Sequence, residues 1–160
     1  MSTDAFLSID DVKGESPVDG FEEQIQVNSW SWSMSQAGTT HRGSGGGAGK
    51  VDVEDMEIKK RADTASPNLA DACCRGKHFE TATLTVRKAA GDAPLDFLII
   101  TMHDVIVTSF EDGGAFGDEE IDETVKLNFA SFDYSYQPQD NKGAKAGGSV
   151  DISYDIAKNV

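Results

Sequence analysis

Three segments of the chain alternate apolar and polar residues with a period of two, and each alternation slips by one residue partway along. They span residues 22–34, 51–60 and 123–136. In the first, the apolar positions move from Ile25 and Val27 to Trp30 and Trp32, with the slip near Asn28. A slip of one residue turns the following side chains to the opposite face unless the strand bends or bulges. Three bent strands predict a small, strongly curved antiparallel sheet that closes into a β-barrel.

Four further segments are predicted to be strands. They span residues 5–9, 81–87, 95–110 and 150–156. The third of these is apolar on both phases of the alternation, which indicates that both of its faces are covered. We expect the barrel interior to cover one face and a helix or a neighbouring subunit to cover the other.

One short helix is predicted, from Pro67 to Arg75. Ser66 is the expected N-cap, because its hydroxyl can accept a hydrogen bond from a free backbone N–H, and Pro67 fits the first helical position. Gly76 suits the left-handed residue that follows a helix, and Arg75 faces the negative end of the helix dipole. The apolar stripe consists of Leu69, Ala72 and Cys73. Since so short a helix is not stable alone, we expect it to lie against the sheet.

Length and charge limit the classes of protein. A chain of 160 residues is about one domain long, so residues 1–160 are predicted to form a single domain with one core. The formal net charge of −14 argues against nucleic acid or an anionic membrane as a partner, because phosphate binding needs clustered Lys and Arg. The longest apolar run, residues 97–100, is too short to insert into a bilayer.

The cysteines and the N-terminus bear on the compartment. Cys73 and Cys74 are adjacent and are the only cysteines, which excludes a disulfide framework and fits synthesis in a reducing cytoplasm. The first residues carry Asp4, Asp10 and Asp11 without a basic lead or a long apolar run. No Sec signal peptide is therefore expected.

Residue types that carry catalysis, cofactors or metals do not form a recognisable site. Gly49 and Lys50 lack the spacing of a phosphate-binding loop. No histidine or nucleophile elbow accompanies Cys74. The histidines lack metal-ligand spacing and are interpreted as separate structural or solvated residues, namely His41, His78 and His103. We predict that the protein is not an enzyme and binds no cofactor or metal.

An acidic cluster precedes the third slipped segment. It consists of Asp118, Glu119, Glu120, Asp122 and Glu123. The cluster lacks the spacing and the glycine of a calcium-binding EF-hand loop. It is interpreted as a solvated loop.

Several stretches occur in an order that is typical of one protein family. They are AFLSIDDVKGES, then SWSWSMSQ with a glycine-rich loop and GKVDVEDM, then ASPNLADACCRGKHF running into ATLTVRKA, then ETVKLNFASFDYSYQPQ. Together they resemble the haemolysin-coregulated proteins (Hcp) of bacterial type VI secretion systems, over nearly the whole chain. Small departures lie at residues 18–21 and near the end, where Ser153 and Tyr154 stand in place of a common Gly-Trp pair. The second departure leaves the path of the C-terminal strand open.

The resemblance implies a phage tail-tube-like fold, in which a β-barrel flanked by one helix assembles into a ring-shaped homohexamer. Rings of the family stack into a hollow tube, which a contracting sheath drives out of the cell with a spike trimer at its tip. The implied partners are the chain itself, the spike, the sheath and baseplate proteins, and small secreted effectors carried in the lumen. The implied location is the cytoplasm before firing, and the extracellular medium or the target cell afterwards. The alternative is a monomeric small-ligand-binding β-barrel or minor enzyme, and the mass in solution distinguishes the two.

The glycine-rich loop at residues 37–50 has no chemistry of its own. Its length suits a segment that becomes ordered when it docks on a neighbour. We therefore expect ring or stacking contacts from its centre, which consists of Gly43, Ser44, Gly45, Gly46 and Gly47.

Residues 29–33 alternate between large apolar and small polar side chains. Trp30 and Trp32 each remove on the order of 200 Å² from water when buried, so they are expected to face the core. Ser29, Ser31 and Ser33 then face outward. Because the resemblance places this strand on the inner wall of the ring, Ser31 is the predicted effector contact, with Ser29 and Ser33 beside it. A merely solvated strand face is the alternative.

Overall fold

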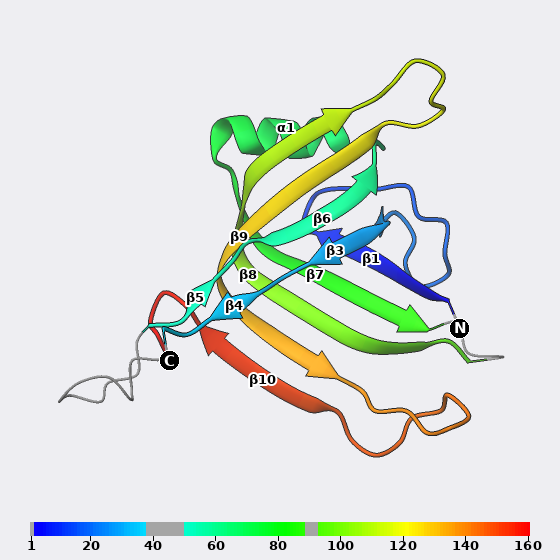
Figure 1. Ribbon diagram of the computed structural model, residues 1–160, viewed down its shortest axis with the longest axis vertical. Coiled ribbons are helices and arrows are strands. Elements are labelled where there is room, and N and C mark those ends of the chain that lie inside the picture. The colour runs from blue at the N-terminus through cyan, green and yellow to red at the C-terminus, as the bar shows by residue number, and fades with distance from the viewer. Residues whose placement is uncertain (1, 38–49, 89–92) are drawn as a thin grey trace.

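The computed structural model describes residues 2–37, 50–88 and 93–160, and it is mainly β with one short helix (Figure 1). The strands are β1 (Thr3–Ile9), β2 (Ile25–Val27), β3 (Ser29–Ser31), β4 (Met34–Ser35), β5 (Asp52–Val53), β6 (Met56–Arg61), β7 (His78–Lys88), β8 (Leu95–Gly113), β9 (Asp122–Tyr136) and β10 (Val150–Asp155). The helix α1 is Ser66–Arg75, between β6 and β7. The predicted fold class is confirmed.

The main sheet is antiparallel and nearly closes on itself. Its order is β2-β1-β7-β8-β9-β6-β3, with β10 paired to β9, while β4 and β5 form a separate pair. Although β2 and β3 are the two ends of this order, only Asn28 separates them in sequence. The Asn28 N–H donates to the carbonyl oxygen of Lys59 at 2.8 Å. One continuous segment therefore pairs with β1 through β2 and with β6 through β3, which wraps the sheet into a barrel.

The three slips in the sequence correspond to breaks or curvature in the strands. Asn28 separates β2 from β3, and Glu54 and Asp55 separate β5 from β6. The third slip leaves β9 unbroken, and there the buried positions move from Phe129 to Phe132. The interpretation of the slips as bends is confirmed at Asn28 and at Glu54 and Asp55, where the strands break, whereas β9 curves without a break (Figure 1).

The interior of the barrel is filled by side chains. The alternation of β7 places Ala82, Leu84 and Val86 in this core, as predicted. The largest fully buried apolar side chains are Leu7, Ile25, Met56, Ile58, Leu69, Leu84, Ile100, Met102, Leu127 and Val105. Burying one such side chain contributes about 1.5–3 kcal/mol relative to leaving it exposed. The barrel is therefore a packed core.

Helix α1 lies against β8, the strand that is apolar on both phases (Figure 1). Leu69 and Ala72 are fully buried and Cys73 is half-buried, which confirms the predicted stripe. Gly76 ends the helix at φ 61° in the left-handed region, and its N–H donates to the carbonyl of Ala72. The helix covers only part of β8. Phe97, near the start of that strand, remains half-exposed.

The N-cap prediction for Ser66 is wrong. The cap position is Ala65, and Ser66 is the first helical residue and is buried. The Ser66 hydroxyl accepts a hydrogen bond from the N–H of Asp63 at 2.9 Å and lies 3.3 Å from Lys60 Nζ. It therefore holds the turn before the helix to the core, and among the residues that the structure describes no side chain caps the first helical N–H groups.

Ser66→Ala is expected to lower the melting temperature by about 2–4 °C, because it removes a buried acceptor whose hydrogen bond contributes on the order of 1 kcal/mol. Thermal unfolding followed by circular dichroism measures the change. Ser29→Ala is the matched control, since Ser29 is exposed on β3. Equal melting temperatures for the two variants would contradict this role of Ser66.

A buried ion pair corrects the interpretation of the acidic cluster. Glu123, its last member, is 1% exposed and lies 2.5 Å from Nζ of Lys60, which is 2% exposed. Lys60 Nζ also lies 2.9 Å from Asp63 Oδ1. Burial raises the pKa of the Glu123 carboxyl above its ordinary value, against the opposing effect of the hydrogen bond from Lys60. The other members of the cluster are exposed, as predicted.

Candidate functional site

Strand β3 and the residues after it present two different faces. Trp30 and Trp32 are half-buried against the core, whereas Ser29, Ser31 and Ser33 are exposed. The Trp32 ring packs edge-on against Phe132 at a centroid distance of 4.8 Å, and it stacks on Tyr134 at 6.3 Å. The tryptophans thus fix which face of this segment points outward.

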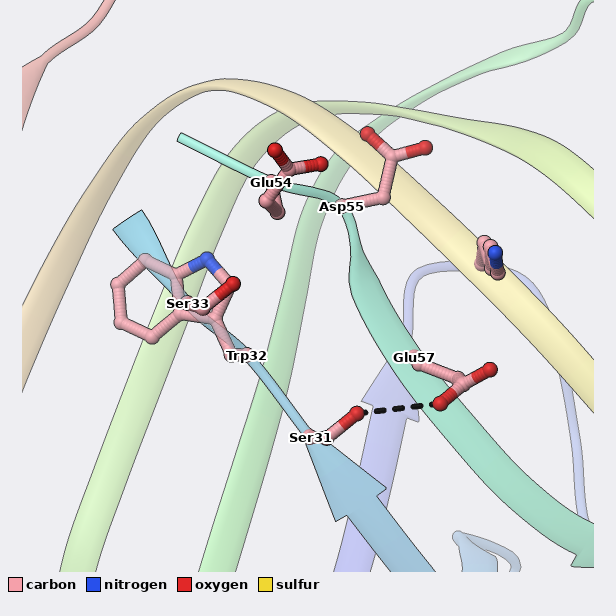
Figure 2. A pocket seen from close by; sticks show the side chains of 7 residues that line it. Ser31, Trp32, Ser33, Glu54, Asp55 and Glu57 are labelled. Atoms are coloured by element: carbon pink, nitrogen blue, oxygen red, sulfur yellow. Dashed lines mark hydrogen bonds between the residues drawn. The ribbon is translucent and has the colours of Figure 1, made fainter. Parts of the chain in front are cut away.

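Ser31 and Ser33 lie together in an open hollow of about 330 Å³ (Figure 2). The hollow is lined by Ser31, Trp32, Ser33, Glu54, Asp55, Glu57 and Lys126. Ser31 is the direct partner of Glu57 in the β3–β6 pairing, and its hydroxyl donates to Glu57 Oε2 at 3.1 Å. Ser29 shares the exposed face but does not line the hollow.

The acidic rim of the hollow is held by hydrogen bonds. Asp55 accepts from Thr108 Oγ1 at 2.6 Å and from Asn128 Nδ2 at 2.9 Å, which ties the bend between β5 and β6 to β8 and β9. The Glu54 N–H donates to the Ser33 carbonyl at 3.0 Å. The carboxylates of Asp55 and Glu57 and the backbone of Glu54 therefore occupy defined positions beside the serines.

This arrangement offers hydrogen-bonding groups on an open surface. Ser31 is bonded to a carboxylate, and among the described residues no histidine lines the hollow to act as its base. Within residues 2–37, 50–88 and 93–160, no group of three metal-ligating side chains is positioned around a common point. The site can contact a polar or positively charged surface, because it combines small hydroxyls with three carboxylates and a single lysine.

Alternation along residues 29–33 identified the serines but not their acidic neighbours. Glu54, Asp55, Glu57 and Lys126 come from β9 and from the segment that contains β5 and β6. Period two predicts which residues of one strand share a face, whereas neighbours on other strands follow only from the pairing order. The slip at Glu54 and Asp55 was the available signal, since bends often carry the side chains at the rim of a barrel.

The remaining candidate residues lie elsewhere. The loop residues Gly43, Ser44, Gly45, Gly46 and Gly47, together with His41, lie outside the described residues. His78 Nδ1 lies 2.8 Å from Asp104, and His103 Nε2 lies 2.7 Å from Asp133. The first of these hydrogen bonds is exposed and the second is partly buried. The bond with His103 lowers the pKa of Asp133, assisted by Ser153. Cys73 and Cys74 are free thiols.

No helix in the described part of the chain is long and apolar enough to span a membrane. The barrel, with helix α1 beside it and an open polar site, defines a small antiparallel β-barrel protein. A family model described as "Type VI secretion system effector, Hcp" matches residues 6–136. Protein hcp1 of Pseudomonas aeruginosa is 48% identical over 160 residues, which cover 100% of this chain and 99% of that protein.

Solved structures agree with this match. Hcp1 from Salmonella typhimurium superposes with a TM-score of 0.82 and 38% identity, covering 99% of this chain and 98% of that one. A structure described as a type six secretion system protein has a TM-score of 0.91 and 29% identity, with 99% of both chains covered. The chain therefore belongs to the Hcp family of type VI secretion system proteins.

Proposed function

We propose that the protein is the structural subunit of a type VI secretion tube. Ring-shaped homohexamers stack into a hollow tube with a spike trimer at its tip. Contraction of the sheath, which is anchored to the baseplate, propels the tube from the cytoplasm into the medium or a target cell, and effectors travel in its lumen. The family match supports this proposal, and one structural observation supports assembly with further copies of the chain.

That observation is the uncovered face of β10. Val150 and Ile152 pair with Tyr136 and Tyr134 of β9, so they continue the face of the sheet that carries the core. They are nevertheless 64% and 57% exposed. In the part of the chain that the structure describes, β9 is the only strand that pairs with β10. Exposed apolar side chains on a strand with a free edge are typical of an interface that another chain covers.

The mass of the purified protein in solution tests the assembly directly. Light scattering after size exclusion should give six chains. A single chain of 17.1 kDa would contradict the tube and favour the monomeric barrel. The packed interior already argues against a ligand inside the barrel, because side chains such as Ile100, Met102 and Leu127 fill it.

The exposed face that carries Ser29, Ser31 and Ser33, which we call the serine face, is proposed to line the lumen of the ring. Small side chains keep a channel open, and hydroxyls can form hydrogen bonds with varied partners. The hollow around Ser31 adds Glu54, Asp55 and Glu57, which would favour effectors with positively charged surfaces. Ser29 and Ser33 extend the same exposed face along the strand.

Ser31→Gln is expected to reduce binding and export of a lumen-carried effector several-fold, while rings and tubes still form. The longer side chain fills the hollow and disrupts the hydrogen bond to Glu57. Effector secreted into the medium is measured beside the secreted tube protein. Ser35→Gln, at an exposed position on β4 that does not line the hollow, is the matched control. Normal export from Ser31→Gln tubes would mean that the serine face is only a solvated wall.

A further inference from the structure

Two groups of exposed apolar side chains lie at opposite ends of the molecule. Phe116 and Ile121 belong to the tip of the β8–β9 hairpin, and Phe116 is fully exposed. Tyr136, Val150 and Ile152 belong to the end of β9 and to β10. Figure 1, with the longest axis vertical, shows the hairpin tip at the top and β10 at the bottom. We call the first group the tip and the second group the β10 face.

The tip is an ordered structure. Pairing between β8 and β9 continues to Gly113 and Asp122. Beyond that pair, the Asp118 N–H donates to the Ala115 carbonyl at 3.0 Å, and the Ala115 N–H donates to Asp118 Oδ2 at 3.0 Å. Phe116 lies inside this turn, which holds its ring in water. Such exposure of a large aromatic side chain is unfavourable in a free protein and is typical of an interface anchor.

The two ends differ in charge. Residues 111–122 contain six carboxylates and no lysine or arginine, namely Glu111, Asp112, Asp118, Glu119, Glu120 and Asp122. The loop at residues 137–149 carries Lys142 and Lys145 against a single carboxylate. Lys88 adds a third cation, because its Nζ lies 4.8 Å from the centre of the Phe97 ring, which in turn packs against Tyr136. Arg61 of β6 pairs with two of the tip carboxylates, Glu120 at 3.2 Å and Asp122 at 2.9 Å, so the surroundings of the tip keep an acidic excess. The surroundings of the β10 face include several cations.

We propose that the tip of one copy packs onto the β10 face of the next copy. Phe116 and Ile121 would cover Val150 and Ile152, and the acidic residues around the tip would face Lys142 and Lys145. The inference rests on the proposed function, and it names one contact of the interface between neighbouring copies in the ring. A tip at one end and its acceptor at the other make a heterologous interface, which can continue from copy to copy until it closes.

One tip alone makes a small contact. A buried aromatic side chain covers about 200 Å², far below the roughly 1,200–2,000 Å² of a stable interface. A closed ring, however, can lose a subunit only by breaking two such contacts together, so ring closure strengthens a weak pair. The contact should therefore act as an essential part of a larger interface.

Phe116→Ala is the first test, read by light scattering after size exclusion. Phe116 makes no core contact, so the variant should keep the wild-type circular dichroism and melting temperature of its barrel. Its ring should dissociate at concentrations at least tenfold higher than the wild-type ring. Met34→Ala is the matched control, because Met34 is exposed but belongs to neither group. A Phe116→Ala ring as stable as the control would overturn the inference.

Cross-linking tests the direction of the contact. Phe116→Cys and Ile152→Cys are combined in a chain in which Cys73 and Cys74 are replaced by serine. Oxidation should give a non-reducing ladder that reaches six chains, whereas a two-fold contact would stop at two and overturn the inference. Met34→Cys with Ile152→Cys should give no ladder.

The outcomes separate this inference from the proposed function. The tip contact is refuted if the wild type is a hexamer but Phe116→Ala leaves its stability unchanged, or if the Phe116→Cys and Ile152→Cys pair does not cross-link. Either result leaves the tube proposal intact. A wild-type protein that remains a single chain at all concentrations refutes the tube proposal itself.

Discussion

Lys60→Met should lower the melting temperature by on the order of 6–20 °C. Lys60 is the cation between two carboxylates, at 2.5 Å from Glu123 and 2.9 Å from Asp63. Without it, Glu123 is left in the core with no compensating charge. Removing one partner of a buried ion pair costs about 3–5 kcal/mol, and each kcal/mol corresponds to about 2–4 °C in a domain of this size. Thermal unfolding at pH 7 gives the difference.

The pH dependence of the stability loss in Lys60→Met distinguishes loss of the ion pair from loss of packing. Burial already raises the pKa of Glu123, and loss of the ammonium group raises it further. A carboxyl whose folded-state pKa lies above its ordinary value, 4.5 for Glu123, contributes most to stability at a pH below that ordinary value. Its contribution is lost as the pH rises through the folded pKa. The deficit of Lys60→Met relative to the wild type should therefore shrink as the pH falls toward 4.5.

Two variants control this experiment. Lys59→Met changes the adjacent, exposed lysine and should stay within about 0.5 kcal/mol of the wild type. Lys60→Met combined with Glu123→Leu removes both charges and should recover most of the lost stability, since apolar replacements of whole buried pairs are often neutral. Indistinguishable melting of Lys60→Met and Lys59→Met would show that the pair contributes nothing.

Ile152→Asp should convert the ring to single chains while the barrel remains folded. Ile152 is 57% exposed in the isolated chain, so an aspartate there is solvated and leaves the core unchanged. In the proposed ring the same position is covered by a neighbour. A carboxylate placed in an apolar interface without a partner is strongly unfavourable. Light scattering should report a sixfold drop in mass at concentrations where the wild type is hexameric.

Val160→Asp is the control for that substitution. Val160 is a comparably exposed apolar residue that lies outside the β10 face. Its variant should assemble as the wild type does. A hexameric Ile152→Asp protein with wild-type stability would place the ring interface elsewhere on the molecule.

The local pattern of the chain predicted most of the fold. Slips near Asn28 and Asp55 predicted bends because they interrupt a period that a straight strand must keep. Gly76 predicted the end of the helix, since its φ of 61° favours glycine. The strand order was not predictable, because the pairing of β1 with β7 and of β6 with β9 joins segments far apart in sequence.

The buried ion pair shows why part of the interior was missed. Lys60 has the same phase as Met56 and Ile58, and Glu123 has the same phase as Val125 and Leu127. The alternation therefore indicated that both side chains point inward, but charged residues are seldom fully buried without a partner. Lys60 and Glu123 are direct partners across β6 and β9, a relation that only the strand pairing shows.

The serine face was predicted and the hollow was not, because the alternation of one strand does not show which strands lie beside it. Residues 29–33 contain the information about their own two faces. Glu57 lies beside Ser31 only because β3 and β6 pair in one register. The acidic residues of the β8–β9 hairpin likewise predicted a solvated loop, and only the structure shows that the Phe116 side chain on it is fully exposed.

The segment that joins β2 to β3 through Asn28 also sets the order of events as the chain is made. On a ribosome, β1, β2 and β3 emerge early, but β1 pairs with β7 from Thr3 opposite Lys88 and β3 pairs with β6. Hairpin contacts of β7, β8 and β9 are local and form faster than such distant pairings. We therefore expect β1 and β2 to pair with each other early and to keep their other edges unpaired during synthesis, with barrel closure as the final step. Until then, their free edges are the part of the nascent chain most in need of a chaperone.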